Sequence, residues 1–543
     1  MAQRIPRLSQ LGGGAGSHLK MGNAYLEQGK HTEALQEFQE ALRLNPKLTL
    51  AHIRLGDVYL AQEKFPEALK SYQTALTLGP DLAVCHLKLG NFYSAQGQYA
   101  DAIKAYEQAL RVDPQNAVCH LQLGTAYFEQ QNYDTAIEEY KQALRFNPQL
   151  VFGYLKLGDV YAAQQQHGTA IEVYRKALGF DPKFAPAHVR IGDAYAAQLR
   201  QEDAMAEYQI AIDLDPKLPV AYVKRGNIYF EQKKLQAAVA DYQKALDLNP
   251  KRQGIVLMAN FKLGNALSAL NLYSEAIEAY ETIVRVNPDL GPAYIKLGNA
   301  YFDQSQYAKA VEAYQAAWRL NPELTQVQVK LGEAHLKQGL FAEALQAFQQ
   351  ALQQDPSLAS AQLGVGNVYF EQKQYVEAQA AYQEALKLNS KLAPAHLRLG
   401  DIYFDQQQYA EAMASYQGAV RANAKLAPAH LRLGELYSRQ QQYAEAMAEY
   451  EAALNLDQQL VVAHRLLAEA RMAQERHAQE AMAYQTAVEL DPHAMQAGDS
   501  SSSSPHGEEE KSEGTENELT TDVQDVASRH QAPEQGLRRR RNH

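Results

Sequence analysis

The sequence lacks the features that mark several large classes of protein. A formal net charge of −11 gives no support for non-specific binding to nucleic acid, which depends on basic residues. No segment reaches the roughly 18 consecutive apolar residues that a membrane span requires, and residues 1–17 hold no apolar run typical of a secretory signal. We therefore expect a soluble, cytoplasmic protein without a nucleic-acid partner or a membrane span.

What the chain does contain is a repeat of 34 residues. Glycines recur at this interval from Gly22 to Gly226 and again from Gly264 to Gly434, with one interval of 38 between the two series. A fixed period between about 20 and 50 residues indicates a repeat architecture. Fourteen repeats result when each is numbered in places 1–34 with this glycine at place 8.

The pattern of apolar and small residues in each repeat predicts two amphipathic helices. Places 4, 7, 8 and 11 fall on one face of a first helix, helix A, expected at about places 2–14. Alanine at place 20 and an aromatic residue at place 24 indicate the packed face of a second helix, helix B, at about places 15–29. Glycine costs a helix about 1 kcal/mol, so its recurrence at place 8 indicates that the two helices approach closely there.

Cysteine and histidine both follow the repeat. The chain's two cysteines, Cys85 and Cys119, occupy equivalent places of neighbouring repeats. A disulfide needs Cα atoms within about 7 Å, whereas packed helices lie about 8–10 Å apart, so we expect two buried free thiols and a reducing compartment. Place 4 is histidine in eight repeats; these side chains are too far apart to share a metal ion, and we expect their titration to make the array acid-sensitive.

These residues resemble the tetratricopeptide repeat, which has small residues at places 8, 20 and 27, aromatic residues at places 11 and 24, and proline at place 32. The resemblance covers residues 15–492. It implies an all-α fold, a right-handed superhelical α-solenoid of tandem helix-turn-helix repeats. It also implies a concave groove lined by helix A and a role as a scaffold for protein partners.

The repeat pattern predicts the organisation of the chain. We expect a flexible lead at 1–14, repeats 1–7 at 15–250, an inserted inter-repeat loop at 251–258, and repeats 8–14 at 259–492. The inserted loop is either an extended turn or a hinge between two binding arcs. The last repeat is degenerate, with Ala468 for glycine, Arg471 for tyrosine and Glu480 for alanine, and we interpret it as the cap of the array.

Residues 493–543 differ from the repeats in composition. They are rich in serine and glutamate and end in a run of arginines, so they bury too little apolar surface to fold and are expected to be a disordered acidic tail. Two interpretations of this tail remain: it occupies a cationic groove of the array, or it has no function of its own.

No catalytic constellation is present. The chain has no glycine-rich phosphate loop, no G-x-S-x-G, no H-E-x-x-H and no C-x-x-C. The repeats leave no space for an inserted enzyme domain of about 100 residues. We expect no enzymatic activity, no catalytic residue, no cofactor and no bound metal.

Charged and amide side chains follow a second face of helix A. Place 6 is Lys or Arg in eleven of fourteen repeats, and place 9 is Asn in six and Asp in four. By the resemblance, both places face the groove. The two places could bind a peptide through its backbone and carboxylates, or acids and bases three residues apart could only neutralise each other. The candidate peptide-binding residues are Lys20, Asn23, Arg54, Asp57, Lys88, Asn91, Lys156, Asp159, Arg190, Asp193, Lys224, Asn227, Lys262, Asn265, Lys296, Asn299, Lys330, Arg398, Asp401 and Arg432.

The function expected from the resemblance is a non-catalytic scaffold that binds extended or helical segments of other proteins, acidic segments among them. Two alternatives are kept. The array could be a self-assembling architectural protein that associates through the ends or edges of the solenoid, or a regulatory array that acts with a separate enzyme.

Overall fold

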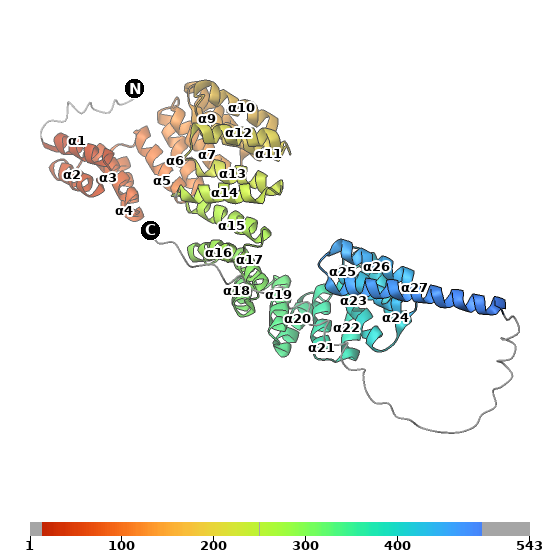
Figure 1. Ribbon diagram of the computed structural model, residues 1–543. Helices are drawn as coiled ribbons and strands as arrows, with labels where there is room; N and C mark the ends of the chain where they lie inside the picture. The colour runs from red at the N-terminus through yellow and green to blue at the C-terminus, as the bar shows by residue number, and fades with distance from the viewer. Residues whose placement is uncertain (1–13, 249, 491–543) are drawn as a thin grey trace, which may run out of the picture. The chain divides into compact units, whose positions relative to one another are not determined.

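The computed structural model describes residues 14–248 and 250–490, which form twenty-seven helices and no strand (Figure 1). The chain divides into two compact units, residues 1–395 and 396–543, and each is described by itself. The expected lead before Gly14 and the expected tail from residue 493 lie outside the described residues. None of the helices in the described ranges has the length and apolar character needed to cross a membrane.

Thirteen repeats consist of a helix A followed by a helix B. The A helices are α1 (Gly14–Glu27), α3 (Thr49–Ala61), α5 (Ala83–Ala95), α7 (Ala117–Glu129), α9 (Val151–Ala163), α11 (Ala185–Ala197), α13 (Pro219–Glu231), α15 (Gln253–Ala269), α17 (Gly291–Asp303), α19 (Thr325–Lys337), α21 (Ala359–Glu371), α23 (Ala393–Asp405) and α25 (Ala427–Arg439). The B helices are α2 (His31–Leu44), α4 (Phe65–Leu78), α6 (Tyr99–Val112), α8 (Tyr133–Phe146), α10 (His167–Phe180), α12 (Gln201–Leu214), α14 (Leu235–Asp247), α16 (Tyr273–Val286), α18 (Tyr307–Leu320), α20 (Phe341–Gln354), α22 (Tyr375–Leu388), α24 (Tyr409–Ala422) and α26 (Tyr443–Leu456).

The two helices of a repeat are joined by a turn whose residue at place 15 has a positive φ. Glycine occupies this place only at Gly29, Gly97 and Gly339, and elsewhere residues such as Leu199 adopt φ near 60°. Helix B therefore begins at place 17 rather than at the expected place 15, because a left-handed residue cannot continue a right-handed helix.

Each hairpin is held by the aromatic ring of helix B, which lies against the glycine of helix A. A Cβ built on Gly158 would lie 2.3 Å from Cε1 of Tyr174, and one built on Gly434 would lie 2.6 Å from Cε1 of Tyr450. The rings at place 24 and the alanines at place 20 are fully or almost fully buried in the thirteen hairpins. The close approach that the glycine periodicity predicted is therefore confirmed.

Successive hairpins pack on one another within each unit, and helix A of one repeat also contacts helix A of the next. The solenoid expected from the resemblance is confirmed at this level. Cys85 and Cys119 are buried and free, as expected. Burial raises the pKa of both thiols to about 12, so neither is reactive near neutral pH.

The 38-residue interval does not form the expected inserted loop. From Gln253 onward these residues belong to α15, which has 17 residues where the other complete A helices of its unit have 13 or 14. The extra residues therefore lengthen helix A by one turn at its N-terminus, because the apolar run 255–258 favours helix there. The boundary between the two compact units lies instead at residue 395.

Repeat 14 is not a hairpin. A single helix, α27 (Val461–Leu490), runs through the places where helix A, the turn and helix B were expected. Its first half packs on α26 and buries Ala463, Leu467 and Ala470, whereas nearly all described side chains beyond residue 473 are exposed. The expected two-helix cap is thus replaced by one long helix.

Candidate binding surface on helix A

The residues at place 9 accept a hydrogen bond from the buried tyrosine of helix B. In ten repeats the hydroxyl at place 24 donates to the side chain at place 9 across 2.8–3.1 Å, as Tyr72 does to Asp57 and Tyr242 to Asn227. Because a buried phenol without a partner would be costly, place 9 has a structural role in addition to any binding role. This contact was not predicted from the sequence, although the tyrosine and its acceptor lie 15 residues apart in all ten repeats.

Where place 9 is aspartate, its carboxylate also binds the base at place 6 of the next repeat. Lys88 Nζ lies 3.0 Å from Asp57, Arg190 Nε 2.9 Å from Asp159, Lys224 Nζ 2.9 Å from Asp193, and Arg432 Nε 3.4 Å from Asp401. Each aspartate thus joins two repeats and accepts from a tyrosine at the same time. Pairing within a helix was one of the two alternatives left open by the sequence, and the structure adds pairing between repeats.

Pairing within helix A occurs as well. Arg54 lies 3.2 Å from Asp57, Lys330 2.8 Å from Glu333, and Arg432 2.8 Å from Glu435. Arg398 Nη1 is 3.7 Å from Asp401. Seven of the eleven bases at place 6 are therefore neutralised by carboxylates of the array itself.

Four of the proposed lysines form no ion pair with any described residue: Lys20, Lys156, Lys262 and Lys296. Lys20 and Lys296 are exposed, and Lys156 and Lys262 are half-buried. Asn23, Asn91, Asn227, Asn265 and Asn299 are the amide members of the candidate set, and the last four accept from the tyrosine of their own repeat. Some bases of the candidate set are therefore neutralised by carboxylates of the array, and these four lysines are not.

The aspartates of the paired stretches are partly desolvated. Burial raises the pKa of Asp159 and Asp401, and the guanidinium groups of Arg190 and Arg432 oppose that shift. The partners therefore offset part of the cost of burying these carboxylates, and a ligand that displaced the partners would remove that compensation.

A cavity of about 430 Å³ opens among the candidate residues of repeats 4–6. Its lining contains Phe128, Glu129, Lys156, Asp159, Ala162, His167, Tyr174, Arg190, Asp193 and Ala194, from α7, α9, α10 and α11. Place 12 is Phe128 in repeat 4 and Phe230 in repeat 7, but Ala162 in repeat 5 and Ala196 in repeat 6. Ala162 lines the cavity, and a bulky ring in its place would fill part of this volume.

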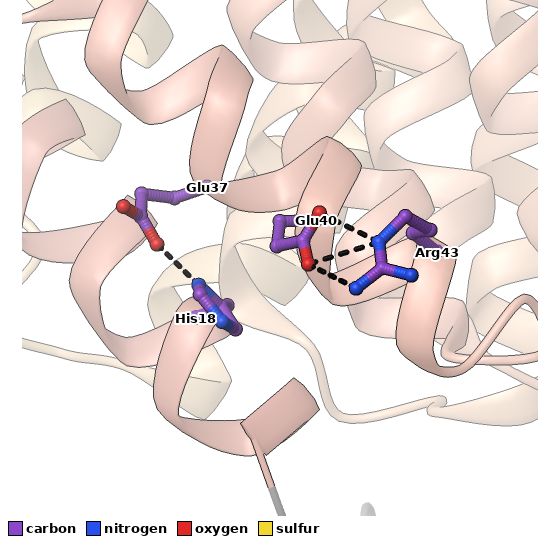
Figure 2. Close-up of polar contacts among 4 residues, drawn as sticks. All are labelled: His18, Glu37, Glu40 and Arg43. Carbon is purple, nitrogen blue, oxygen red and sulfur yellow. Dashed lines mark hydrogen bonds and ion pairs between the residues drawn. The ribbon is translucent and has the colours of Figure 1, made fainter.

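Several histidines at place 4 contact a glutamate of helix B in the same repeat, the carbonyl of the preceding turn, or both. Nδ1 of His18 lies 2.7 Å from Glu37 of α2, next to the Glu40–Arg43 pair on the same helix (Figure 2). In repeat 4, Nδ1 of His120 is 2.6 Å from Glu139 and Nε2 is 3.1 Å from the carbonyl of Pro114 in the preceding turn.

Both partners of His120 are hydrogen-bond acceptors. Burial opposes the charged imidazolium, but the contacts with Glu139 and the Pro114 carbonyl outweigh it and raise the pKa of His120. The folded state therefore favours protonation of His120, so acid should stabilise this contact. The expectation that acid destabilises the array is wrong for this side chain.

Comparisons with known proteins identify the repeat. A tetratricopeptide repeat family model matches residues 19–83, 87–151, 261–325, 295–359 and 329–395, and related models match 219–252 and 427–460. A TPR repeat model matches residues 158–198, 192–232 and 400–441. No curated protein matches the chain.

Solved structures of repeat proteins are similar to parts or most of the chain. MamA is 29% identical over 30% of this chain and 95% of its own, with a TM-score of 0.28. A tetratricopeptide repeat protein from Parabacteroides merdae is 19% identical over 46% of this chain and 98% of its own, with a TM-score of 0.40. Yeast Tom70 is 15% identical over 89% of this chain and 98% of its own, with a TM-score of 0.39. With family models matching repeats in both units, the chain belongs to the tetratricopeptide repeat family, whose arrays are typically non-catalytic scaffolds for protein partners.

Proposed function

We propose that this scaffold binds extended or helical peptide segments of partner proteins on the surface formed by its A helices. The observation that carries the proposal is the cavity of repeats 4–6, whose lining includes Lys156, Asp159, Arg190 and Asp193 at the places that the resemblance assigns to the groove. A volume of about 430 Å³ lies within the range of roughly 300–1,000 Å³ found for binding pockets. It is large enough for an anchoring side chain of a peptide.

The chemistry of the cavity suits an amphipathic anchor. Phe128, Ala162 and Ala194 offer apolar contact. The ammonium group of Lys156 makes no close ion pair with a described residue, whereas Asp159 of the same helix lies 2.9 Å from Arg190. A peptide side chain that fills the cavity would therefore cover apolar surface while a carboxylate or carbonyl group accepts from Lys156.

The test begins with a selection from displayed random peptides of about 12 residues, which reach about 40 Å when extended. The full-length protein is the target, and the affinities of selected peptides are measured by fluorescence polarisation. The variant Ala162→Phe gives repeat 5 the residue that repeats 4 and 7 already carry at this place, so the fold should accept it. We expect this variant to lose about tenfold or more in affinity.

The matched control is Ala100→Phe, which adds a ring at an exposed alanine of α6 outside the cavity. It should bind the selected peptides like the unmodified protein. A selection without specific peptides, or peptides that bind the filled cavity as tightly as the open one, would refute the proposal. Sedimentation at several concentrations tests the alternative of self-assembly, which requires oligomers that grow with concentration.

A further inference from the structure

The un-neutralised lysines are not scattered evenly, and two of them lie in adjacent repeats with asparagine at place 9. Repeats 7, 8 and 9 carry Asn227, Asn265 and Asn299 there, and repeats 8 and 9 carry Lys262 and Lys296 at place 6. These five residues are called the donor stretch. Where place 9 is aspartate, its carboxylate neutralises the base at place 6 of the next repeat; these repeats are called the paired stretches. In the donor stretch place 9 is asparagine, so Lys262 and Lys296 have no such carboxylate.

The hydrogen bonds of the asparagines fix which way their amides face. The hydroxyls of Tyr242, Tyr280 and Tyr314 donate to the Oδ1 atoms of the three asparagines across 2.8–2.9 Å. The acceptor of each amide is therefore turned toward the buried ring, and its NH2 group is left on the other side. No described residue accepts from these NH2 groups. The donor stretch therefore presents ammonium and amide hydrogen-bond donors that have no acceptor among the described residues.

The donor stretch has definite ends. Toward the N-terminus, Lys224 is bound to Asp193 at 2.9 Å, and toward the C-terminus, Lys330 is bound to Glu333 at 2.8 Å. At place 13, Glu231 of α13 and Asp303 of α17 are acidic and exposed, but α15 carries Ala269 there. The two outer helices of the donor stretch thus each carry an acid at their C-terminal end, whereas α15 at its centre contains no acidic residue.

We propose that the donor stretch binds an acidic segment of a partner protein, in extended conformation, with carboxylates at every third residue. The spacing follows from the repeat. Lys262 and Lys296 occupy the same place of contacting A helices, which lie about 10 Å apart, and an extended chain advances about 3.3 Å per residue. One carboxylate on each lysine therefore corresponds to a separation of three residues, with the asparagine NH2 groups donating to the carbonyls between them. This inference rests on the proposed function.

The probe is a fluorescein-labelled peptide of about nine residues, which spans about 30 Å when extended. It has glutamate at every third position and serine elsewhere. Two matched peptides accompany it: one with glutamine in place of glutamate, and one with the same glutamates placed next to each other. We expect the spaced acidic peptide to bind the full-length protein best. Its binding should weaken as salt rises from about 0.1 M to about 1 M, over which the screening length falls from about 10 Å to about 3 Å.

The decisive variant leaves both lysines in place. Asn265→Asp/Asn299→Asp keeps an acceptor for Tyr280 and Tyr314 but supplies the carboxylates that the paired stretches have. The aspartate at position 265 should then bind Lys296 as Asp57 binds Lys88. We expect affinity for the acidic peptide to fall about tenfold, with an unchanged thermal midpoint.

A variant outside the donor stretch is the matched control. Asn367→Asp makes the same substitution at place 9 of repeat 11 and keeps an acceptor for Tyr382, so it should bind the acidic peptide like the unmodified protein. Equal affinity of all three proteins, or equal binding of the glutamine peptide, would overturn the inference. If peptides selected for the cavity of repeats 4–6 still bind in that case, only this inference fails; if they fail too, the proposed function fails with it.

Discussion

Repeats 13 and 14 are neighbours in the same unit and differ in whether the second helix folds back. In repeat 13 the chain turns at Gln441, whose φ is 60°, and α26 packs against α25. In repeat 14 the corresponding residue, Glu475, lies within α27. In repeat 14 the same stretch of chain forms one long helix. Residues that differ between the two repeats therefore decide whether helix B folds back on helix A.

Three substitutions in repeat 14 explain the difference. Ala468 places a methyl group where Gly434 leaves space for a ring, and Glu480 places a charge where Ala446 is fully buried. Arg471 replaces the tyrosine of place 11 and instead binds Glu451 of α26 at 2.9 Å. Folding back would therefore require a clash and a buried carboxylate, whereas the continuous helix keeps its backbone hydrogen bonds and leaves Glu480 in water.

The largest effect is expected when repeat 13 receives the acidic residue of repeat 14. Ala446→Glu buries a carboxylate at a site with no exposed surface and should destabilise the hairpin by about 4 kcal/mol. Hydrogen exchange of α25 and α26 measures the stability of this hairpin alone. A local measurement is needed because a repeat array need not unfold in a single two-state step. Ala444→Glu on the exposed face of α26 is the control, and comparable exchange in both variants would contradict the explanation.

A smaller loss is expected from the glycine. Gly434→Ala places a methyl group 2.6 Å from Cε1 of Tyr450 and 3.2 Å from the carbonyl oxygen of Ala446, which should cost about 2 kcal/mol. The same substitution at Gly179 of α10 meets no atom within 4 Å and should stabilise its helix by about 0.5–1 kcal/mol. The thermal midpoints of the two variants should shift in opposite directions, and a rise in both would show that helix propensity alone decides.

The smallest effect concerns the contacts of His120 with Glu139 and with the carbonyl of Pro114. His120 has a raised pKa in the folded state, so its contribution to stability is fully present below the unfolded pKa, about 6.5. It is lost as pH rises through the folded pKa. Hydrogen exchange of repeat 4, corrected for its intrinsic pH dependence, should show more protection at pH about 5.5 than at about 7.5.

Glu139→Gln should reduce this pH dependence of repeat 4. Repeat 3 is an internal control, because its His86 contacts the carbonyl of Pro80 but faces Ala105 where repeat 4 has Glu139. If protection in repeats 3 and 4 changes equally with pH, or if the Glu139→Gln variant behaves like the unmodified protein, the carboxylate is not the cause.

Much of the fold could be predicted because each prediction depended on spacing within one repeat. The glycine at place 8 and the ring at place 24 are 16 residues apart wherever they occur, so periodicity alone indicated their contact. The continuous helix α27 was not predicted. Ala468 and Glu480 indicate that the packing between helix A and helix B is lost, but they do not indicate which structure forms instead.

The candidate site was harder to predict because its contacts join different repeats. Whether Lys88 meets Asp57 of the preceding repeat depends on the step between hairpins, which no single repeat encodes. Arg225 illustrates the same limit: it replaces the usual leucine at place 7 and binds Asp241 of the facing helix B at 2.6 Å. A charge at an apolar place indicates a partner but does not identify it.

The buried hydroxyls at place 24 give the array an optical property. Burial, with a neighbouring carboxylate, raises the pKa of Tyr208 and Tyr416 far above that of a free phenol. In alkaline solution the exposed tyrosines should therefore ionise first, while the rings between the helices stay neutral until their own hairpin opens. Phenolate absorbance would then report the loss of the solenoid without any added label.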